Sequence, residues 1–155
     1  SAGKHDVCHQ LGADVVIDYN ADDFVAVTND ATEGLGIDVV LDVIGGEYTP
    51  RNVSALRLGG RIIQVGVMAG GPVPFNVASL LMKRATITGT TLRARPIEEK
   101  VAITREFAAQ ILPHVASGAI SPVIDSRYPL DEVADAHERM ASNANAGKLV
   151  LDISE

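Results

Sequence analysis

The chain has 155 residues, and 46% of them are hydrophobic, which is enough for one domain with a core of its own. Its formal net charge of −7, without a visible basic patch, argues against a nucleic-acid partner. The single cysteine excludes an internal disulfide, and no apolar run is long enough to span a bilayer. These features predict a cytoplasmic protein that binds neither nucleic acid nor a membrane.

The first half of the chain predicts alternating helices and strands. Apolar runs rich in β-branched residues predict strands at residues 15–17, 39–44, 62–67 and 86–90. Helices are expected at residues 4–11, 22–32 and 49–56. This alternation is typical of β-α-β units, and it predicts an α/β fold with a parallel sheet.

The second half predicts two helices and one strand. A long helix is expected over residues 96–118, with one buried face, because Ile97, Val101 and Ile111 recur at helical spacing. Another helix is expected at residues 130–140, and a closing strand at residues 148–153.

Glycines, hydroxyls or charges follow each of the four strands predicted in the first half, at its carboxyl end. In open parallel sheets, ligands bind beyond these ends, and glycine lets a backbone approach a ligand closely. The sequence therefore predicts a binding site built from these turns, although ordinary turns between strands and helices also favour glycine. Asp42 lies within an apolar run, so its carboxylate either bonds a neighbouring backbone turn or faces the ligand cleft.

Familiar catalytic motifs are absent from the sequence. It contains no Gly-x-Ser-x-Gly elbow, no P-loop and no Gly-x-Gly-x-x-Gly fingerprint. The spacing of His5, Cys8 and His9 would place them on one helix face, but no fourth ligand accompanies them, so no metal is expected.

Several segments carry a family resemblance over essentially the whole chain. They are LGADVVIDY at residues 11–19, DVVLDVIGG at 38–46, GGRIIQVG at 59–66, KRATITGTTLRAR at 83–95, AH at 136–137 and GKLVL at 147–151. In this order and spacing they resemble the medium-chain dehydrogenase/reductase superfamily, and specifically its zeta-crystallin-like quinone oxidoreductase branch.

The resemblance implies a partial Rossmann fold, with a doubly wound parallel sheet that lacks its first strands. Residues 1–95 would form part of a nucleotide-binding domain, and residues 96–155 would supply helices and a closing strand that return to the catalytic domain. Ser1 takes the position of a serine that ends the second Rossmann strand in this family. The chain is thus expected to be the C-terminal portion of a longer enzyme, without the glycine loop.

The resemblance also implies residues that bind NADPH. Ser1 and Lys4 would hold the 2′-phosphate, because a hydroxyl and a cation suit a phosphate, whereas an NAD enzyme places an acid on the ribose. Tyr19 would pack near the adenosine end. The other implied cofactor-binding positions are Val43, Gly45, Gly66, Val67, Met68, Gly89, Thr90, Thr91, Asn143 and Lys148.

Relatives of this type reduce quinones or other activated double bonds by hydride transfer from NADPH. The resemblance thus implies a homodimeric quinone oxidoreductase that acts on a quinone or another small electrophile, with catalytic residues still unassigned. Two alternatives stay open. One is an enoyl-thioester reductase or zinc-independent alcohol dehydrogenase of the same superfamily, and the other is a non-catalytic module that binds nucleotide or self-associates.

Overall fold

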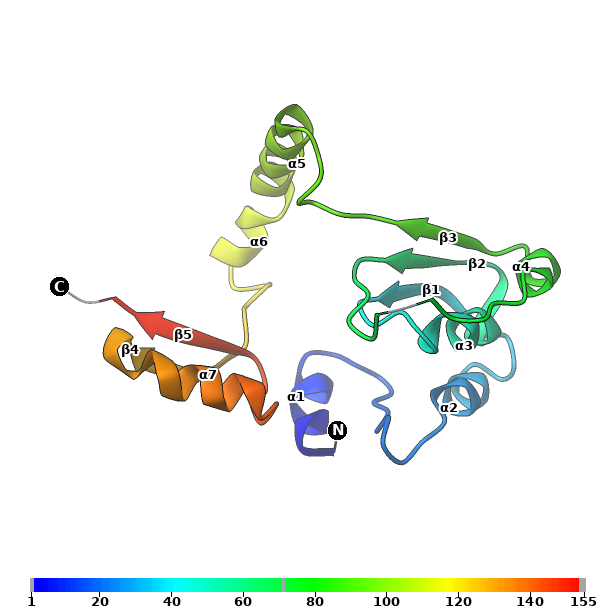
Figure 1. The fold of residues 1–155 in the computed structure, drawn as a ribbon, viewed down its shortest axis with the longest axis horizontal. Coiled ribbons are helices and arrows are strands. Elements are labelled where there is room, and N and C mark those ends of the chain that lie inside the picture. The colour runs from blue at the N-terminus through cyan, green and yellow to red at the C-terminus, as the bar shows by residue number, and fades with distance from the viewer. Residues whose placement is uncertain (1, 71, 154–155) are drawn as a thin grey trace. The chain divides into compact units, whose positions relative to one another are not determined.

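The computed structural model describes residues 2–70 and 72–153. The chain divides into two compact units, Ser1–Arg95 and Pro96–Glu155 (Figure 1).

The first unit contains a parallel three-stranded sheet in the order β1-β2-β3. Its elements are η1 (Ala2–Lys4), α1 (His5–Gln10), α2 (Phe24–Ala31), β1 (Ile37–Asp42), α3 (Tyr48–Ala55), β2 (Leu56–Gln64), α4 (Ala78–Lys83) and β3 (Thr86–Gly89). Helix α3 connects β1 to β2, and α4 lies between β2 and β3, as parallel strands require. The prediction of an α/β fold with a parallel sheet and partial Rossmann character is confirmed.

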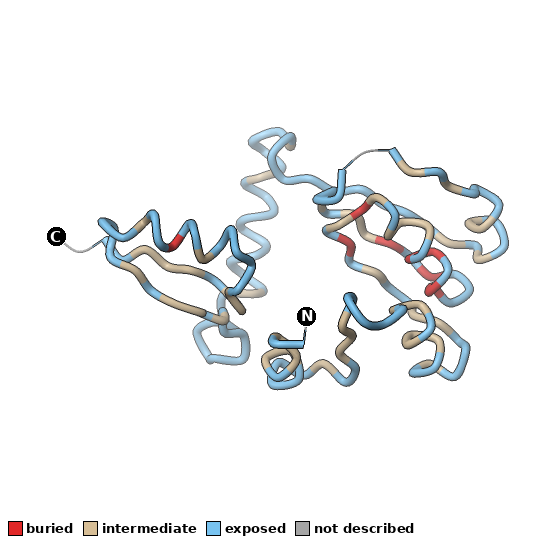
Figure 2. The backbone as a smooth tube through the Cα atoms, turned by 60° about the horizontal axis from the view of Figure 1, so that its bottom comes forward, coloured by how far each residue is buried: buried red, intermediate tan, exposed pale blue. Residues whose placement is uncertain are grey.

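The core of this unit lies between β2 and the helix that precedes it. Val53 of α3 and Leu56 and Ile62 of β2 are fully buried. Figure 2 shows that most of the buried residues lie in this unit. Each such side chain contributes roughly 1.5–3 kcal/mol by leaving water. By contrast, Val39 and Leu41 of β1 are 44% and 69% exposed. The alternation along β1 therefore buries one of its faces more than the other.

The junction between α2 and α3 shows how local chemistry sets the helix boundaries. Asp23 caps α2, and its carboxylate accepts a hydrogen bond from the Val25 amide at 3.0 Å. Arg51 of α3 pairs with the same carboxylate at 2.8 Å, and its guanidinium lies 4.5 Å from the centre of the Phe24 ring. These contacts hold α2 against α3.

The predicted strand at residues 15–17 is wrong, because these residues join neither sheet. A strand exists only where its backbone pairs with that of a neighbour. The three strands of this unit pair in the order β1-β2-β3, and residues 15–17 have no place in that order. A β-branched run alone was not sufficient to make a strand.

The second unit is a parallel β-α-β arrangement preceded by two helices. Its elements are α5 (Ile97–Gln110), α6 (Leu112–Ala116), β4 (Ile124–Pro129), η2 (Leu130–Glu132), α7 (Val133–Ala141) and β5 (Lys148–Asp152). Strand β4 pairs in parallel with β5, and α7 packs against both. The closing strand is confirmed as β5. Strand β4 was not predicted, because half of its residues are polar or charged.

The long helix predicted over residues 96–118 is divided. Helix α5 ends at Gln110, and α6 begins at Leu112, with Pro113 in its first turn. Proline has no amide hydrogen and its ring crowds the preceding helical turn, so it kinks or breaks a helix at this point. The expected buried face is also wrong, because Ile97 is 65% exposed and α5 contains no buried residue.

Among the residues that the structure describes, no helix is both long enough and apolar enough to cross a membrane.

Candidate functional site

The carboxyl ends of the three strands in the first unit meet at one edge of the sheet. Asp42, Gln64 and Gly89 lie opposite one another in register. The Val65 amide donates to the Asp42 carbonyl at 2.8 Å, and the Thr90 amide donates to the Gln64 carbonyl at 3.0 Å. These hydrogen bonds extend the pairing just beyond the strands, so the turns after β1, β2 and β3 form one continuous edge.

Two loops at this edge pack directly against each other. We call residues 43–46, after β1, the first strand-end loop, and residues 65–70, after β2, the second strand-end loop. The Met68 amide donates to the Val43 carbonyl at 3.2 Å, and the Ala69 amide donates to the Ile44 carbonyl at 2.9 Å. The structure thus brings together the predicted positions in these two loops.

Glycine makes this close approach sterically feasible. A Cβ added to Gly66 would lie 2.9 Å from the Val43 carbonyl oxygen, closer than real Cβ atoms approach backbone. Gly45 has a positive φ of 67°, and a Cβ there would lie 3.1 Å from a methyl carbon of Val67. These two glycines are required by the packing of the loops, apart from any role toward a ligand.

The alternatives for Asp42 are decided by its hydrogen bonds. The residue is 4% exposed, and one carboxylate oxygen accepts from the Ile44 and Gly45 amides at 2.6 and 3.0 Å. The other oxygen accepts from the side-chain amide of Asn52 at 2.9 Å. Asp42 therefore fixes the first strand-end loop from inside the protein.

Asn52 was missed by the sequence analysis. It is 5% exposed on α3, beside the buried Val53. A polar residue on the inward face of a helix is a signal that could have been used, because buried amides need a hydrogen-bond partner. The choice of Asp42 as that partner depends on the packing of α3 on β1.

Side chains at this edge leave apolar surface open. Val67 and Met68 are 66% and 80% exposed, and Val43 is 44% exposed. The carboxyl half of β1, together with Phe24 and Tyr48, lines a pocket of about 240 Å³. A backbone edge beside exposed apolar side chains suits a ligand that is partly flat and apolar and partly polar.

The turn after β3 adds a cation to this edge. The Arg95 guanidinium donates to the Thr91 carbonyl at 2.9 Å and to the Thr90 hydroxyl at 3.3 Å. The predicted positions Gly89, Thr90 and Thr91 thus lie at the end of β3 and just after it, and Arg95 bonds the Thr91 backbone and the Thr90 side chain.

Two predicted residues near the amino end, Lys4 and Tyr19, lie in neighbouring segments. Ser1 lies outside the described residues, and Lys4 ends the short helix η1. The Ala2 amide donates to the Asp18 carboxylate at 3.1 Å, which places η1 beside the turn that carries Tyr19. The Asn20 backbone amide also donates a hydrogen bond to the Asp18 carboxylate. This bond has the largest effect on the pKa of the carboxyl, which is lowered. Tyr19 itself is 55% exposed.

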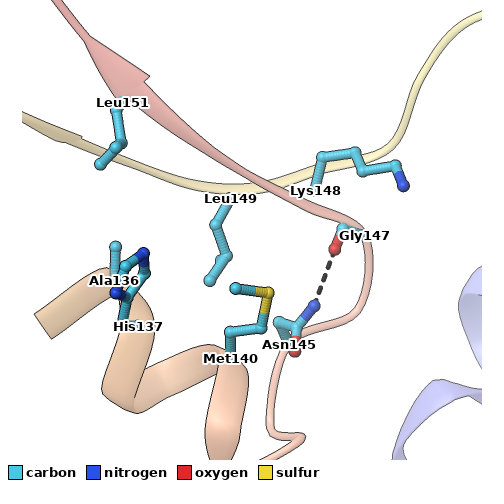
Figure 3. A pocket seen from close by; sticks show the side chains of 8 residues that line it. All are labelled: Ala136, His137, Met140, Asn145, Gly147, Lys148, Leu149 and Leu151. Carbon is cyan, nitrogen blue, oxygen red and sulfur yellow. Dashed lines mark hydrogen bonds between the residues drawn. The ribbon is translucent and has the colours of Figure 1, made fainter. Parts of the chain in front are cut away.

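Asn143 and Lys148 belong to the second unit. Asn143 has a left-handed backbone, with φ of 55°, and Lys148 begins β5. Lys148 and Asn145 help line a pocket of about 270 Å³ between α7 and β5 (Figure 3). The Asn145 side chain turns back to donate to the Gly147 carbonyl at 2.8 Å.

An ion pair holds the loop that leads into this pocket. The Arg139 guanidinium donates twice to the Asp125 carboxylate, at 2.7 and 3.1 Å, and the Ala146 amide donates to it at 2.8 Å. The Asp125 side chain is only 9% exposed. The hydrogen bonds from Arg139, followed by that from Ala146, hold the pKa of Asp125 well below its usual range.

Comparison with known proteins places the chain in a family. The family model described as zinc-binding dehydrogenase matches residues 11–151. The chain belongs to this family. The quinone oxidoreductase of Lama guanicoe is 40% identical over 72 residues, which are 46% of this chain and 21% of that protein. The matched part thus spans about a fifth of the curated relative's length.

Two solved structures are similar over nearly the whole chain. An NAD-dependent alcohol dehydrogenase is 28% identical, with a TM-score of 0.77, and the match covers 99% of this chain and 42% of that one. A 2-haloacrylate reductase is 26% identical, with a TM-score of 0.79, and the match covers 100% of this chain and 48% of that one.

The family description implies zinc, which proteins bind through at least three side chains in most sites. Among the described residues, no group of three His, Cys, Asp or Glu side chains could hold a metal ion. His5, Cys8 and His9 form no such group.

Proposed function

We propose that this chain supplies nucleotide-binding structure to an NADPH-dependent oxidoreductase that reduces a quinone. The observation that carries the proposal is the packed pair of strand-end loops, where Gly45 and Gly66 allow two backbones to meet beside exposed apolar side chains. Dinucleotides bind at such edges of open parallel sheets. The similarity to a quinone oxidoreductase supports the choice of substrate class.

The residues at this edge fit the two kinds of surface in a dinucleotide. Val43 and Gly45 would line the ribose and diphosphate. Gly66, Val67 and Met68 would approach the nicotinamide through their backbone groups. Gly89, Thr90 and Thr91 would close the nicotinamide side, and the Arg95 guanidinium would add positive charge next to them.

The choice of NADPH over NADH depends on the amino end of the chain. Ser1 and Lys4 would bind the 2′-phosphate, and Tyr19 would cover the adenosine. Asn143 and Lys148, on the second unit, are further proposed contacts. Since one similar structure is an NAD-dependent enzyme, Lys4 is the residue whose replacement tests the preference.

The bound nicotinamide supplies the chemistry, which is transfer of a hydride to the acceptor. Reduction of a quinone to a hydroquinone consumes that hydride and one proton, and it leaves the oxidised nucleotide. The residues of this chain would bind the nucleotide, orient its ring and exclude water. Catalytic residues stay unassigned, and the remaining contacts to the quinone would come from a catalytic domain outside residues 1–155.

The test uses the gene product that carries this chain, with a simple benzoquinone as acceptor. We expect quinone reduction with NADPH, at least about tenfold more efficient than with NADH. Lys4→Ala should raise the KM for NADPH and leave that for NADH nearly unchanged. Absence of quinone reduction with both nucleotides would refute the proposal.

A second candidate is reduction of an activated alkene, because a 2-haloacrylate reductase is similar over the whole chain. Enoyl-thioester reduction and zinc-independent alcohol oxidation are further candidate reactions. The gene product should be assayed on a benzoquinone, an enoyl thioester and a simple alcohol under the same conditions. If it binds nucleotide but turns over none of them, a non-catalytic role is favoured.

We also propose that the protein forms a homodimer. Exposed apolar side chains at β1 and a sheet with open edges support association. Sedimentation analysis of the gene product tests this, and a monomer at micromolar concentration would contradict it.

A further inference from the structure

Gln64 lies between the two strand-end loops, although its sequence position marks only the end of a strand. It stands opposite Asp42 on one side and Gly89 on the other. Its side-chain nitrogen, Nε2, donates to the Gly66 carbonyl at 2.6 Å and to the Asp42 carbonyl at 3.3 Å. A Cβ on Gly45 would lie 3.5 Å from the same nitrogen. One partly buried amide thus joins the end of β1 to the second strand-end loop.

The contact with Gly66 controls the direction of the next amide. A peptide group is planar, so the Gly66 carbonyl and the Val67 N–H lie in one rigid plane and point in opposite directions. When Gln64 draws the Gly66 carbonyl oxygen toward itself, it turns the Val67 N–H to the other side. The amide side chain carries two donors, which allows it to serve both carbonyls.

We propose that Gln64 is a positioning residue, which holds the Gly66 carbonyl and thereby aims the Val67 N–H at the bound nicotinamide. The role toward nicotinamide rests on the proposed function, whereas the role in holding the loop does not. Asp42, at the end of β1, holds the first strand-end loop with the support of Asn52 from α3, and Gln64 holds the second strand-end loop from β2. The two supports act on different loops, so they can be removed separately.

Two replacements of Gln64 test the proposal in the gene product that carries the chain. Gln64→Met keeps the length of the side chain and removes both donors. Gln64→Glu keeps the shape and places a carboxylate against two carbonyl oxygens. Gln10→Glu, on the exposed face of α1, adds the same charge far along the chain and is the control.

Amide hydrogen exchange measures how firmly the second strand-end loop is held, and it needs no bound nucleotide. We expect the Met68 and Ala69 amides, which bond the first strand-end loop, to exchange about five- to tenfold faster in Gln64→Met. The Ile62 and Ile63 amides inside β2 should keep their rates. Equal acceleration along all of β2 would show a merely structural role and overturn the proposal, as would unchanged rates at Met68 and Ala69.

Steady-state kinetics test whether the Val67 N–H is directed at the nicotinamide. We expect kcat for quinone reduction to fall about tenfold in Gln64→Met and further in Gln64→Glu, while the KM for quinone changes little. Gln10→Glu should match the unmodified protein. Unchanged kcat in both variants of an active enzyme would overturn the proposal.

If the unmodified protein neither binds nucleotide nor reduces quinone, the proposed function fails, and with it the role toward nicotinamide. Faster exchange at Met68 would then still show that Gln64 holds the loop.

Discussion

The side-chain amide of Asn52 donates to the Asp42 carboxylate across 2.9 Å and joins helix α3 to the carboxyl end of strand β1. Both residues are nearly buried, with 5% and 4% of their surface exposed. Because the same carboxylate also binds the Ile44 and Gly45 amides, the helix, the strand and the first strand-end loop share one anchor. Stability and the geometry of the candidate site are therefore coupled at this point.

Replacement of Asp42 should destabilise the first unit strongly. Asp42→Ala leaves two backbone amides and the Asn52 amide without their acceptor, so we expect a loss of about 2–4 kcal/mol of unfolding free energy. Urea denaturation followed by circular dichroism measures it. Asp38→Ala, on the same strand, removes an exposed carboxylate and should cost under about 1 kcal/mol. Similar losses in both variants would contradict the role assigned to Asp42.

Gly66→Ala should separate the two strand-end loops. The added methyl would meet the Val43 carbonyl oxygen at 2.9 Å, and backbone cannot move away as a side-chain tip can. We expect a loss of about 1–3 kcal/mol together with faster exchange at Met68. Gly3→Ala is the control, because nothing lies within 4 Å of the added Cβ. A Gly66→Ala protein as stable as the control would show that the loops can part without strain.

The second unit should lose stability in acid through Asp125. The pKa of this carboxyl is lowered in the folded protein, first by the hydrogen bonds from Arg139. A lowered folded pKa contributes stability above the ordinary value of 3.8, and that contribution declines as the pH falls below it toward the folded pKa. Arg139→Gln should therefore lower the melting temperature at pH 7. The difference in melting temperature between this variant and the unmodified protein should become smaller below about pH 3.

The matched control for this experiment is Arg127→Gln, which removes the exposed pair between Arg127 and Asp152. It should leave the acid profile of the unfolding transition nearly as it is in the unmodified protein. Thermal melts between about pH 7 and 2 compare the three proteins. If Arg139→Gln keeps the full difference from the unmodified protein at the lowest pH, the ion pair is not the source of the acid sensitivity.

Self-association should depend on the exposed face of β1. Leu41 is 69% exposed on a strand at the edge of the sheet, which is a surface that invites pairing with another chain. Leu41→Lys should shift the protein toward monomer in sedimentation velocity at micromolar concentration. Leu35→Lys adds the same charge at a residue that is 76% exposed before the strand, and it should leave association unchanged. Equal effects would point to net charge instead of the β1 face.

The sequence pointed to the two strand-end loops but not to the residues that support them. The sequence pointed to Gly45 and Gly66, because glycine after a strand is a local signal. It left Asp42 open between two roles, and it did not single out Asn52 or Gln64. Their contacts join residues 10 and 22 positions apart to Asp42. Such pairs are set by how α3 and β2 pack on β1, which no local pattern contains.

The sequence by itself indicated an alternation of helices and strands, typical of a parallel sheet, and the turns where glycine stands, because periodicity and turn chemistry act over a few neighbouring residues. Only the tertiary structure decided which segments became strands. Residues 15–17 are β-branched but belong to neither sheet, while the more polar β4 pairs with β5. The physical reason is that a strand needs a partner for its backbone hydrogen bonds, and the partner lies elsewhere in the chain.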